Sequence, residues 1–127
     1  MIGIILVSHS EKITDGIVEM INEMVGDAEN VQIHSAGGTG DGRLGTNTVM
    51  IMEKIAACDR CQHILIFNDI GSALLSSEMA KDLVEDVALQ QKIQLVEAPL
   101  VEGAFAAAVQ ASVTNDLSLI FKEVAAV

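Results

Sequence analysis

Apolar and polar positions alternate in two different rhythms along almost the whole chain. Four short apolar runs have the length and composition of buried strands. They span residues 2–7, 31–34, 63–67 and 93–96. Between these runs apolar residues recur every three or four positions, which is typical of helices that pack on one side. The pattern therefore predicts a chain in which strands and helices alternate.

Capping residues and apolar rows define the predicted helices more closely. The caps are expected at Ser10, at Thr46 or Asn47, and at Ser72. A final helical segment covers about residues 103–124 and is broken near 115–116. The rows expected to face the core are Ile13, Ile17, Ile21 and Met24 in the first helix, Val49, Met52, Ile55 and Ala56 in the second, and Leu75, Met79, Leu83 and Val87 in the third.

Short connections between strands and helices predict right-handed crossovers and a parallel sheet. We therefore predict an α/β fold: a single three-layer domain over residues 1–127, with a mainly parallel four-stranded sheet in the order 2-1-3-4 and helices on both faces. In such sheets ligands bind beyond the carboxyl ends of the strands, where the winding direction reverses. This rule selects the segments that follow the strands, at residues 8–10, 37–45, 68–72 and 97–103.

Composition and charge exclude several classes of function. The 127 residues include 18 acidic and 7 basic side chains, a formal net charge of −11, and three Phe with no Trp or Tyr. Nucleic-acid binding requires cations and usually aromatic side chains, and an anionic membrane surface would repel this chain. No basic residue precedes Lys12, and no apolar segment is long enough to span a bilayer. We expect a cytoplasmic protein that binds neither nucleic acid nor membrane.

His9 is the residue with the clearest chemical potential. It lies where the first strand ends and a helix begins, beside unpaired helical amides that favour an anion such as phosphate. Ser10 belongs to this turn and is expected to bind phosphoryl oxygens. An imidazole titrates near neutral pH, so an uncharged, nucleophilic fraction is available. The position favours phosphoryl transfer through a phosphohistidine; the alternative is that His9 only fills or caps the turn.

Asp69 is the expected partner of His9. It follows the third strand, and the first and third strands are neighbours when the winding reverses between them. A carboxylate bound to one ring nitrogen fixes the tautomer and leaves the other nitrogen free to attack. Gly71 and Ser72 open the next helix and offer a second set of amides for phosphoryl oxygens. The alternative is a turn aspartate that binds the amides of Gly71 and Ser72.

Three other motifs favour less specific interpretations. The glycine-rich segment 37–45 lacks the lysine of a nucleotide-binding P-loop, so a flexible lid or a partner-docking loop is expected. Cys58 and Cys61 have thioredoxin-like spacing but follow a helix, where the dipole opposes a thiolate. No fourth zinc ligand lies nearby, so we expect no metal site. Ser8 is poorly placed as a nucleophile for His9, because adjacent strand residues point to opposite faces.

These residues resemble those of the mannose-type EIIA family, and within it the phosphotransferase subunits (DhaM) of the PTS-dependent dihydroxyacetone kinases. The resemblance extends over essentially the full chain. Its most specific segments are Val7-Ser8-His9-Ser10, the sequence Ile70-Gly71-Ser72-Ala73-Leu74-Leu75 after Asp69, and Ala98-Pro99-Leu100-Val101-Glu102-Gly103-Ala104. Mannose-transporter domains typically have a Gly-Gly-Ser-Pro turn after the aspartate, so the Gly71-Ser72-Ala73 version favours the kinase subunit.

The resemblance implies a role in a phosphoryl relay. His9 would accept a phosphoryl group from the phosphocarrier HPr and pass it to ADP held on the nucleotide-binding subunit, DhaL. Asp69 would orient His9, and Ser72 would hold phosphoryl oxygens. No cofactor or metal is implied on this chain, because ADP or ATP and Mg²⁺ would lie on the partner subunit. The family is usually a homodimer, and the alanine-rich segment 104–113 is the expected contact face.

Two alternatives remain open from the sequence. The same chemistry could deliver the phosphoryl group to a IIB domain of a mannose-type sugar transporter. A regulatory docking module, which senses phosphorylation without sustaining flux, could also be built on this domain.

Overall fold

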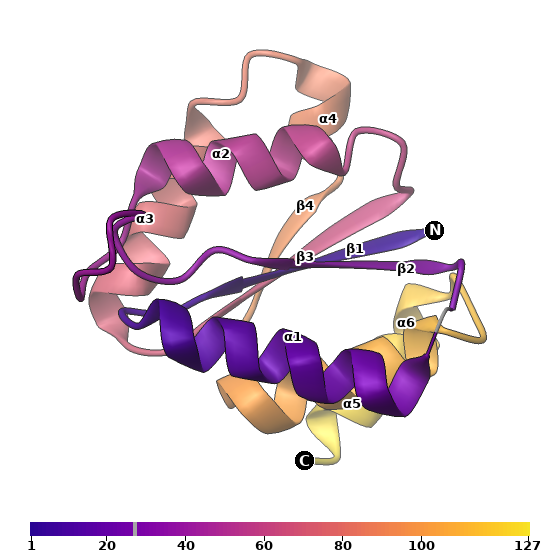
Figure 1. The fold of residues 1–127 in the computed structure, drawn as a ribbon. Helices are drawn as coiled ribbons and strands as arrows, with labels where there is room; N and C mark the ends of the chain where they lie inside the picture. The colour runs from indigo at the N-terminus through magenta and orange to yellow at the C-terminus, as the bar shows by residue number, and fades with distance from the viewer. Residues whose placement is uncertain (27) are drawn as a thin grey trace.

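The structure is a computed structural model in which residues 1–26 and 28–127 are described. Figure 1 shows strands and helices alternating along the chain, as the apolar pattern predicts. The elements are β1 (Ile2–Val7), α1 (Glu11–Val25), β2 (Val31–Ser35), α2 (Thr48–Ala57), β3 (His63–Asn68), α3 (Gly71–Asp82), α4 (Val87–Gln91), β4 (Ile93–Val96), α5 (Leu100–Ala111) and α6 (Leu117–Ala125).

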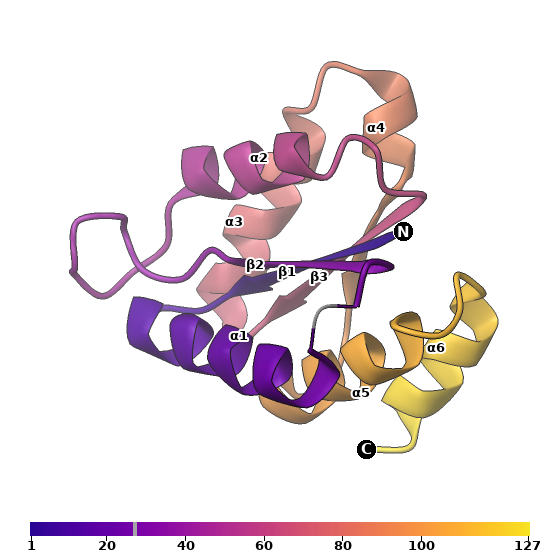
Figure 2. The same ribbon diagram turned by 45° about the vertical axis from the view of Figure 1, so that its right-hand side comes forward.

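The four strands form one parallel sheet in the order β2-β1-β3-β4. Helices α1, α5 and α6 cover one face, and α2, α3 and α4 cover the other (Figure 2). Side chains of β1 alternate between the two cores: Ile4 and Leu6 pack towards α1 and α5, whereas Ile5 and Val7 pack towards α2 and α3. The predicted fold class and strand order are confirmed.

Helix α1 turns a different row towards the sheet than the apolar spacing predicts. Ile17 and Ile21 are buried as expected, but Ile13 and Met24 are exposed. The orientation follows from Thr14, which is fully buried and whose hydroxyl oxygen accepts from Ser35 Oγ at 2.7 Å and from the Gly37 amide at 3.1 Å. These bonds fix the face of α1 that lies on the sheet.

Helix α3 departs further from its predicted orientation. Ala73, Ser77 and Ala80 face the sheet, whereas the predicted core row is exposed to solvent. The small side chains allow α3 to lie close to the sheet, and the larger ones are left on the outer side. The predicted row is also divided, because α3 ends at Asp82 and Val87 opens the separate helix α4.

Helix α2 follows its prediction in part. Ile55 is buried, but Val49 and Ala56 are exposed, and Ile51 takes the second buried position. Asn47 caps this helix as predicted, since its side chain accepts from the Met50 amide at 3.0 Å. Ser72 does not cap α3, which begins one residue earlier at Gly71.

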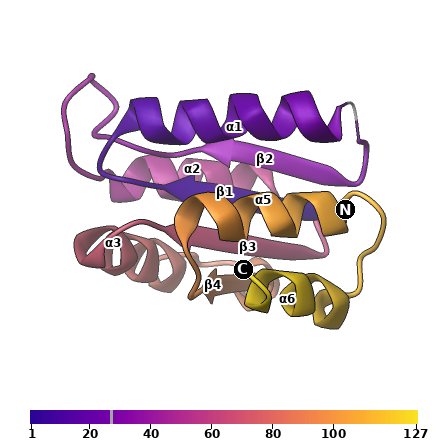
Figure 3. The ribbon, with the colours of Figure 1, turned by 90° about the horizontal axis from the view of Figure 1, so that it is seen from below.

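The alanine-rich segment packs inside this chain. α5 lies against the sheet face that it shares with α1 (Figure 3), and four of its alanines have no exposed surface. These are Ala104, Ala107, Ala108 and Ala111. These alanines are therefore used in the core, whereas Val109 and Val113 of the same segment are 44% and 78% exposed. That segment 104–113 forms a contact face between two copies stays a prediction. The predicted break at 115–116 is confirmed by the gap between α5 and α6.

No helix within residues 1–26 and 28–127 is both long and apolar enough to cross a membrane.

Candidate active site

Two neighbouring strands bring the predicted site residues together. β1 and β3 pair in parallel with Val7 opposite Asn68, so the chain leaves both strands at the same level of the sheet. His9, two residues after the end of β1, and Asp69, the residue after the end of β3, lie in the turns that lead into α1 and α3. Both turns lie at the left edge of the sheet in Figure 1. This is the carboxyl edge, where the strand order reverses around β1.

His9 and Asp69 contact each other through both ring and backbone. Nδ1 of His9 lies 3.1 Å from Oδ1 of Asp69, and the His9 amide donates to Oδ2 at 3.0 Å. The two side chains are 27% and 21% exposed. The imidazole is therefore bound at Nδ1 by the carboxylate of Asp69, and part of the ring remains exposed to solvent.

The carboxylate of Asp69 is surrounded by hydrogen-bond donors. Besides the two groups of His9, the Ile70 amide donates to Oδ1 at 2.7 Å and the Ser8 hydroxyl donates to Oδ2 at 2.9 Å. Partial burial alone would raise the pKa of Asp69, but hydrogen bonds from the His9 and Ile70 amides, the Ser8 hydroxyl and the His9 ring outweigh it, so this pKa lies below its usual value. Asp69 is ionised at neutral pH.

The other ring nitrogen of His9 points towards the start of α3. Nε2 contacts Oγ of Ser72, the second residue of that helix. In the described part of the chain, the amides of Gly71 and Ser72 donate to no backbone or side-chain acceptor. A helix N-terminus with free amides favours negative charge. The oxygens of a group attached to Nε2 would therefore lie close to the amides of Gly71 and Ser72.

Ser10 lies next to His9 in the sequence, but its backbone groups form hydrogen bonds with Ser8 and Thr14. It is the N-terminal cap residue of α1, yet its hydroxyl makes no capping bond. Its amide donates to Ser8 Oγ at 3.0 Å, and its carbonyl accepts from Thr14. The contacts of Ser10 thus stabilise the turn, and its predicted binding of phosphoryl oxygens stays a prediction.

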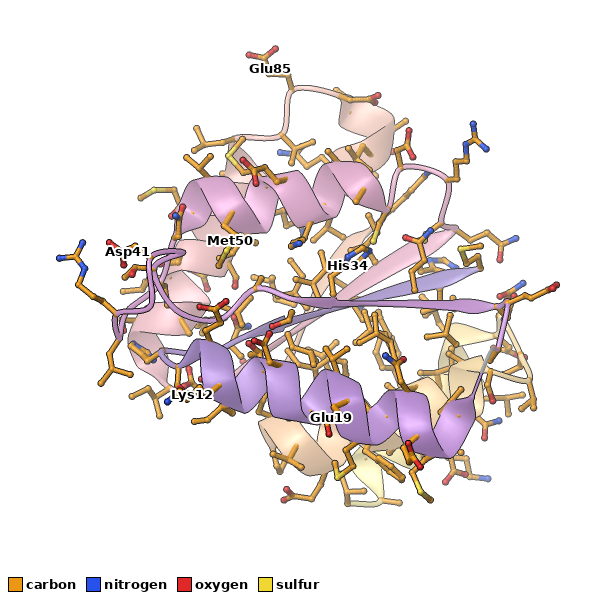
Figure 4. All side chains as sticks on the ribbon, in the orientation of Figure 1. Lys12, Glu19, His34, Asp41, Met50 and Glu85 are labelled. Carbon is orange, nitrogen blue, oxygen red and sulfur yellow. The ribbon has the colours of Figure 1, made fainter. Side chains whose placement is uncertain are left out.

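The glycine-rich segment 37–45 is attached to the turn that carries His9. The Gly38 amide donates to the Ser8 carbonyl at 3.0 Å, and the Gly45 amide donates to the His9 carbonyl at 2.8 Å. Figure 4 shows Asp41 of this segment at the same end of the molecule as Lys12 of α1. A Cβ atom on Gly37 would lie 2.6 Å from the Ser10 carbonyl oxygen, so only glycine fits there. The segment supports the turn, and its role as a lid or docking loop stays a prediction.

Ser8 is the site residue that the sequence argument missed. Its hydroxyl contacts the same carboxylate as His9, although strand alternation assigns the two side chains to opposite faces. Alternation ends at Val7, where β1 ends and the chain turns. The signal in the sequence was a serine placed directly after a continuous apolar strand.

The two cysteines lie between α2 and the start of β3, at the opposite end of this strand from Asp69, and pack in the core beneath α2, α3 and α4. Cys58 and Cys61 are both free and fully buried, and a Cβ atom on Gly3 would lie only 2.7 Å from Cys58 Sγ. Burial, with the neighbouring Cys61, raises the pKa of the Cys58 thiol to about 12. A thiol that stays protonated is neither a nucleophile nor a metal ligand at neutral pH.

The raised pKa predicts a pH dependence of stability. Above the usual thiol value of 9.0 the unfolded chain loses the Cys58 proton, while the folded chain keeps it up to about 12. The contribution of the Cys58 thiol to the free energy of unfolding is therefore fully present below pH 9 and is lost as the pH rises towards 12. The loss is up to about 1.4 kcal/mol per pH unit. Urea unfolding under reducing conditions at pH 7 and 10.5 should show the free-energy gap between wild type and Cys58→Ala narrowing; a constant gap would contradict the assignment.

Comparison with known proteins agrees with this geometry. The sequence profile described as "PTS system fructose IIA component" (EIIA-man) matches residues 3–121. A crystal structure described as a protein of unknown function, EF1359, superposes with a TM-score of 0.86 at 50% identity, over 97% of this chain and 92% of that one. The fold and site thus define a three-layer α/β domain with a histidine and a carboxylate at the switch point of its sheet.

Curated relatives extend the comparison. A Listeria innocua protein named "PEP-dependent dihydroxyacetone kinase 2, phosphoryl donor subunit DhaM" is 58% identical over 97% of this chain and 96% of its own length. A Providencia stuartii protein named as the phosphoryl donor subunit DhaM is 42% identical over 88% of this chain. The chain spans only 24% of that second relative. The chain belongs to the EIIA-man family of phosphotransferase-system proteins.

Proposed function

We propose that this protein is the phosphoryl donor subunit of a phosphoenolpyruvate-dependent dihydroxyacetone kinase. In this proposal His9 accepts a phosphoryl group from HPr and passes it to ADP bound on the DhaL subunit. The observation that carries the proposal is the His9 ring, bound at Nδ1 by Asp69 and in contact at Nε2 with Ser72 Oγ at the start of α3. The name and near-complete coverage of the Listeria innocua relative support the choice of acceptor.

The geometry suits transfer through Nε2. With Nδ1–H donating to Asp69, Nε2 carries the lone pair that attacks phosphorus. In the structure this lone pair faces the Ser72 hydroxyl, which must turn to a phosphoryl oxygen as the new bond forms. The negative charge of Asp69 then offsets the positive charge of the phosphorylated ring. Ser72 and the amides at the start of α3 are positioned to bind phosphoryl oxygens. Phosphoryl transfer depends mainly on such positioning and charge compensation.

The remaining components of the reaction belong to partners in this proposal. ADP or ATP and Mg²⁺ would be bound by the DhaL subunit, because this chain contributes the reacting imidazole and the amides around it. The site lies at a sheet edge and is partly exposed, which allows two proteins to approach in turn. Two buried, unpaired cysteines fit a reducing, cytoplasmic location.

We also propose that the protein is a homodimer. We place the contact on the outer face of α3 and not on segment 104–113, because four alanines of that segment are buried in the core. Leu75, Met79 and Leu83 lie one helical turn apart and are 65%, 57% and 51% exposed. A row of this kind is unusual on the surface of a monomer. In this proposal HPr and DhaL bind the site only in turn, so neither covers the side chains of Leu75, Met79 and Leu83 permanently. A second copy of this chain would cover them permanently. Pairing of two α3 helices about a twofold axis is the simplest arrangement.

The dimer proposal predicts a specific response to charge. Met79→Glu would bury two carboxylates against an apolar surface, so the variant should sediment at the mass of one chain while the wild type sediments at twice that mass. Met24→Glu is the matched control, because Met24 on α1 is 65% exposed against 57% for Met79, and it should leave the wild-type mass unchanged. A dimeric Met79→Glu protein, or a monomeric wild type, would exclude this interface.

Reconstitution tests the proposed function and separates it from its alternatives. Enzyme I, HPr, this chain and the rest of the kinase, including DhaL, should convert dihydroxyacetone to its phosphate steadily with phosphoenolpyruvate as donor. A phosphorylated protein that transfers only to a IIB domain would instead indicate a sugar transporter. Phosphorylation without turnover of either acceptor would indicate a regulatory docking module.

A further inference from the structure

Ser8 is a fully buried polar residue whose hydroxyl both donates and accepts a hydrogen bond. It has no exposed surface. Its Oγ donates to Oδ2 of Asp69 at 2.9 Å and accepts from the Ser10 amide at 3.0 Å. The amide fixes the position of the oxygen, and the oxygen in turn directs its proton to the carboxylate. Ser8 therefore connects the first turn of α1 to the carboxylate behind His9.

The two oxygens of Asp69 share the imidazole but differ in their other partners. Oδ2 accepts from Ser8 Oγ and the His9 amide, whereas Oδ1 accepts from the Ile70 amide. Nδ1 of His9 lies 3.1 Å from Oδ1 and 3.3 Å from Oδ2. Both oxygens are thus held by the protein, and Ser8 Oγ is the hydroxyl donor at Oδ2. Apart from His9, Ser8 provides the only side chain in the described ranges, 1–26 and 28–127, that hydrogen-bonds to Asp69.

We propose that Ser8 is a positioning residue for the phosphoryl transfer, because its hydroxyl holds Asp69 in the orientation that keeps the proton of His9 on Nδ1 and the lone pair on Nε2. This inference rests on the proposed function of His9. Ser8 touches neither the reacting nitrogen nor the phosphoryl group, so it acts only through Asp69.

The role follows from the electron and proton balance of the step. The lone pair of Nε2 forms the new bond to phosphorus, and the electron pair of the donor's bond to phosphorus leaves with the donor. The proton on Nδ1 stays in place, so the phosphorylated ring becomes cationic and needs an ionised, correctly oriented Asp69. A hydrogen bond from Ser8 favours the ionised form of the carboxylate and lowers its pKa, in the same direction as the bonds from His9 and Ile70.

The test combines a rate with two spectroscopic readouts on the full chain. Ser8→Ala should be labelled from phosphoenolpyruvate, enzyme I and HPr about tenfold more slowly than wild type, since a hydrogen bond to a charged group is lost. In ¹³C NMR the Asp69 carboxyl should titrate at higher pH, and ¹⁵N NMR of the His9 ring should show more of the Nε2–H tautomer. Ser8→Thr keeps the hydroxyl and should restore all three properties.

Ser77→Ala is the matched control. Ser77 is also fully buried and donates to a side chain, Asn68, at 2.5 Å, so its loss is similarly structural. It should leave the Asp69 titration and the His9 tautomer unchanged. If Ser8→Ala does not fold, Ser8→Cys, a weaker donor of similar shape, should shift the Asp69 titration in the same direction by a smaller amount.

The outcomes separate the inference from the function on which it rests. A Ser8→Ala protein with wild-type labelling rate, Asp69 titration and tautomer would overturn the role of Ser8 while leaving His9 as the acceptor. The same result from Ser8→Cys would also overturn it. A wild-type protein that is never labelled would instead refute the proposed function, whatever the spectra of the Ser8 variants show.

Discussion

His9→Ala is expected to abolish phosphorylation of the protein and, with it, turnover of dihydroxyacetone in the reconstituted system. The imidazole supplies the lone pair that attacks phosphorus, and its Nε2 contacts Ser72 at the start of α3. The measurement is transfer of label from phosphoenolpyruvate through enzyme I and HPr, followed by denaturing electrophoresis at alkaline pH, where phosphohistidine survives.

His63→Ala is the control for this experiment. His63 opens β3, at the end of the strand opposite to Asp69, so its loss should leave labelling intact. Equal labelling of wild type and His9→Ala would show that the phosphoryl group is carried elsewhere.

Asp69→Asn is expected to slow phosphorylation by about 10²- to 10⁴-fold, because loss of a carboxylate that fixes the tautomer of a catalytic histidine has effects of up to this size. Every group within hydrogen-bond distance of the carboxylate is a donor: the Ser8 hydroxyl, the His9 and Ile70 amides and Nδ1–H of His9. An amide side chain accepts through only one of its two terminal atoms. Its NH₂ group must therefore face either the donors at Oδ2 or the ring of His9.

Both orientations of the substituted amide are unfavourable. If the NH₂ group faces Nδ1, the imidazole must carry its proton on Nε2, and the attacking lone pair is lost. If it faces Ser8 and the His9 amide, two buried donors lose their acceptor. Asp116→Asn, the same chemical change at the cap of α6, should not affect the labelling rate, since asparagine caps helices equally well. A wild-type rate for Asp69→Asn would show that Asp69 does not orient His9.

The fold was predictable because its signals are strong and local. β1 and β3 are continuous apolar runs, as expected for central strands covered by helices on both faces, and their alternation with helices determines a parallel sheet. The rule that functional residues follow the strands at a reversal of order then brings His9 and Asp69 together. That juxtaposition depends on topology, which the pattern of elements predicts well.

The orientation of the helices was harder to predict, because periodicity identifies an apolar row without showing what covers it. In α3 the larger residues Leu75 and Met79 lie outside, and Ala73 and Ala80 lie on the sheet. Small residues carry little weight in an apolar pattern, yet they allow the closest packing. A row that faces a second copy has the same pattern as one that faces the core.

The side chains that support the site were the least visible in the sequence. Ser8 contacts Asp69 only because the chain turns immediately after β1, and Gly37 is required only because the Ser10 carbonyl lies close to it. Both depend on distances of a few ångströms between segments far apart in the sequence. Residue types alone do not contain this information.

The central claim is that the phosphoryl group is carried on Nε2 of His9 while Asp69 holds the proton on Nδ1. The most direct measurement is ¹⁵N and ³¹P NMR of the ¹⁵N-labelled protein after phosphorylation by enzyme I and HPr. We predict coupling of phosphorus to Nε2 of His9 and a proton retained on Nδ1. Phosphorus on Nδ1, or on any other residue, would contradict the arrangement described for His9, Asp69 and Ser72.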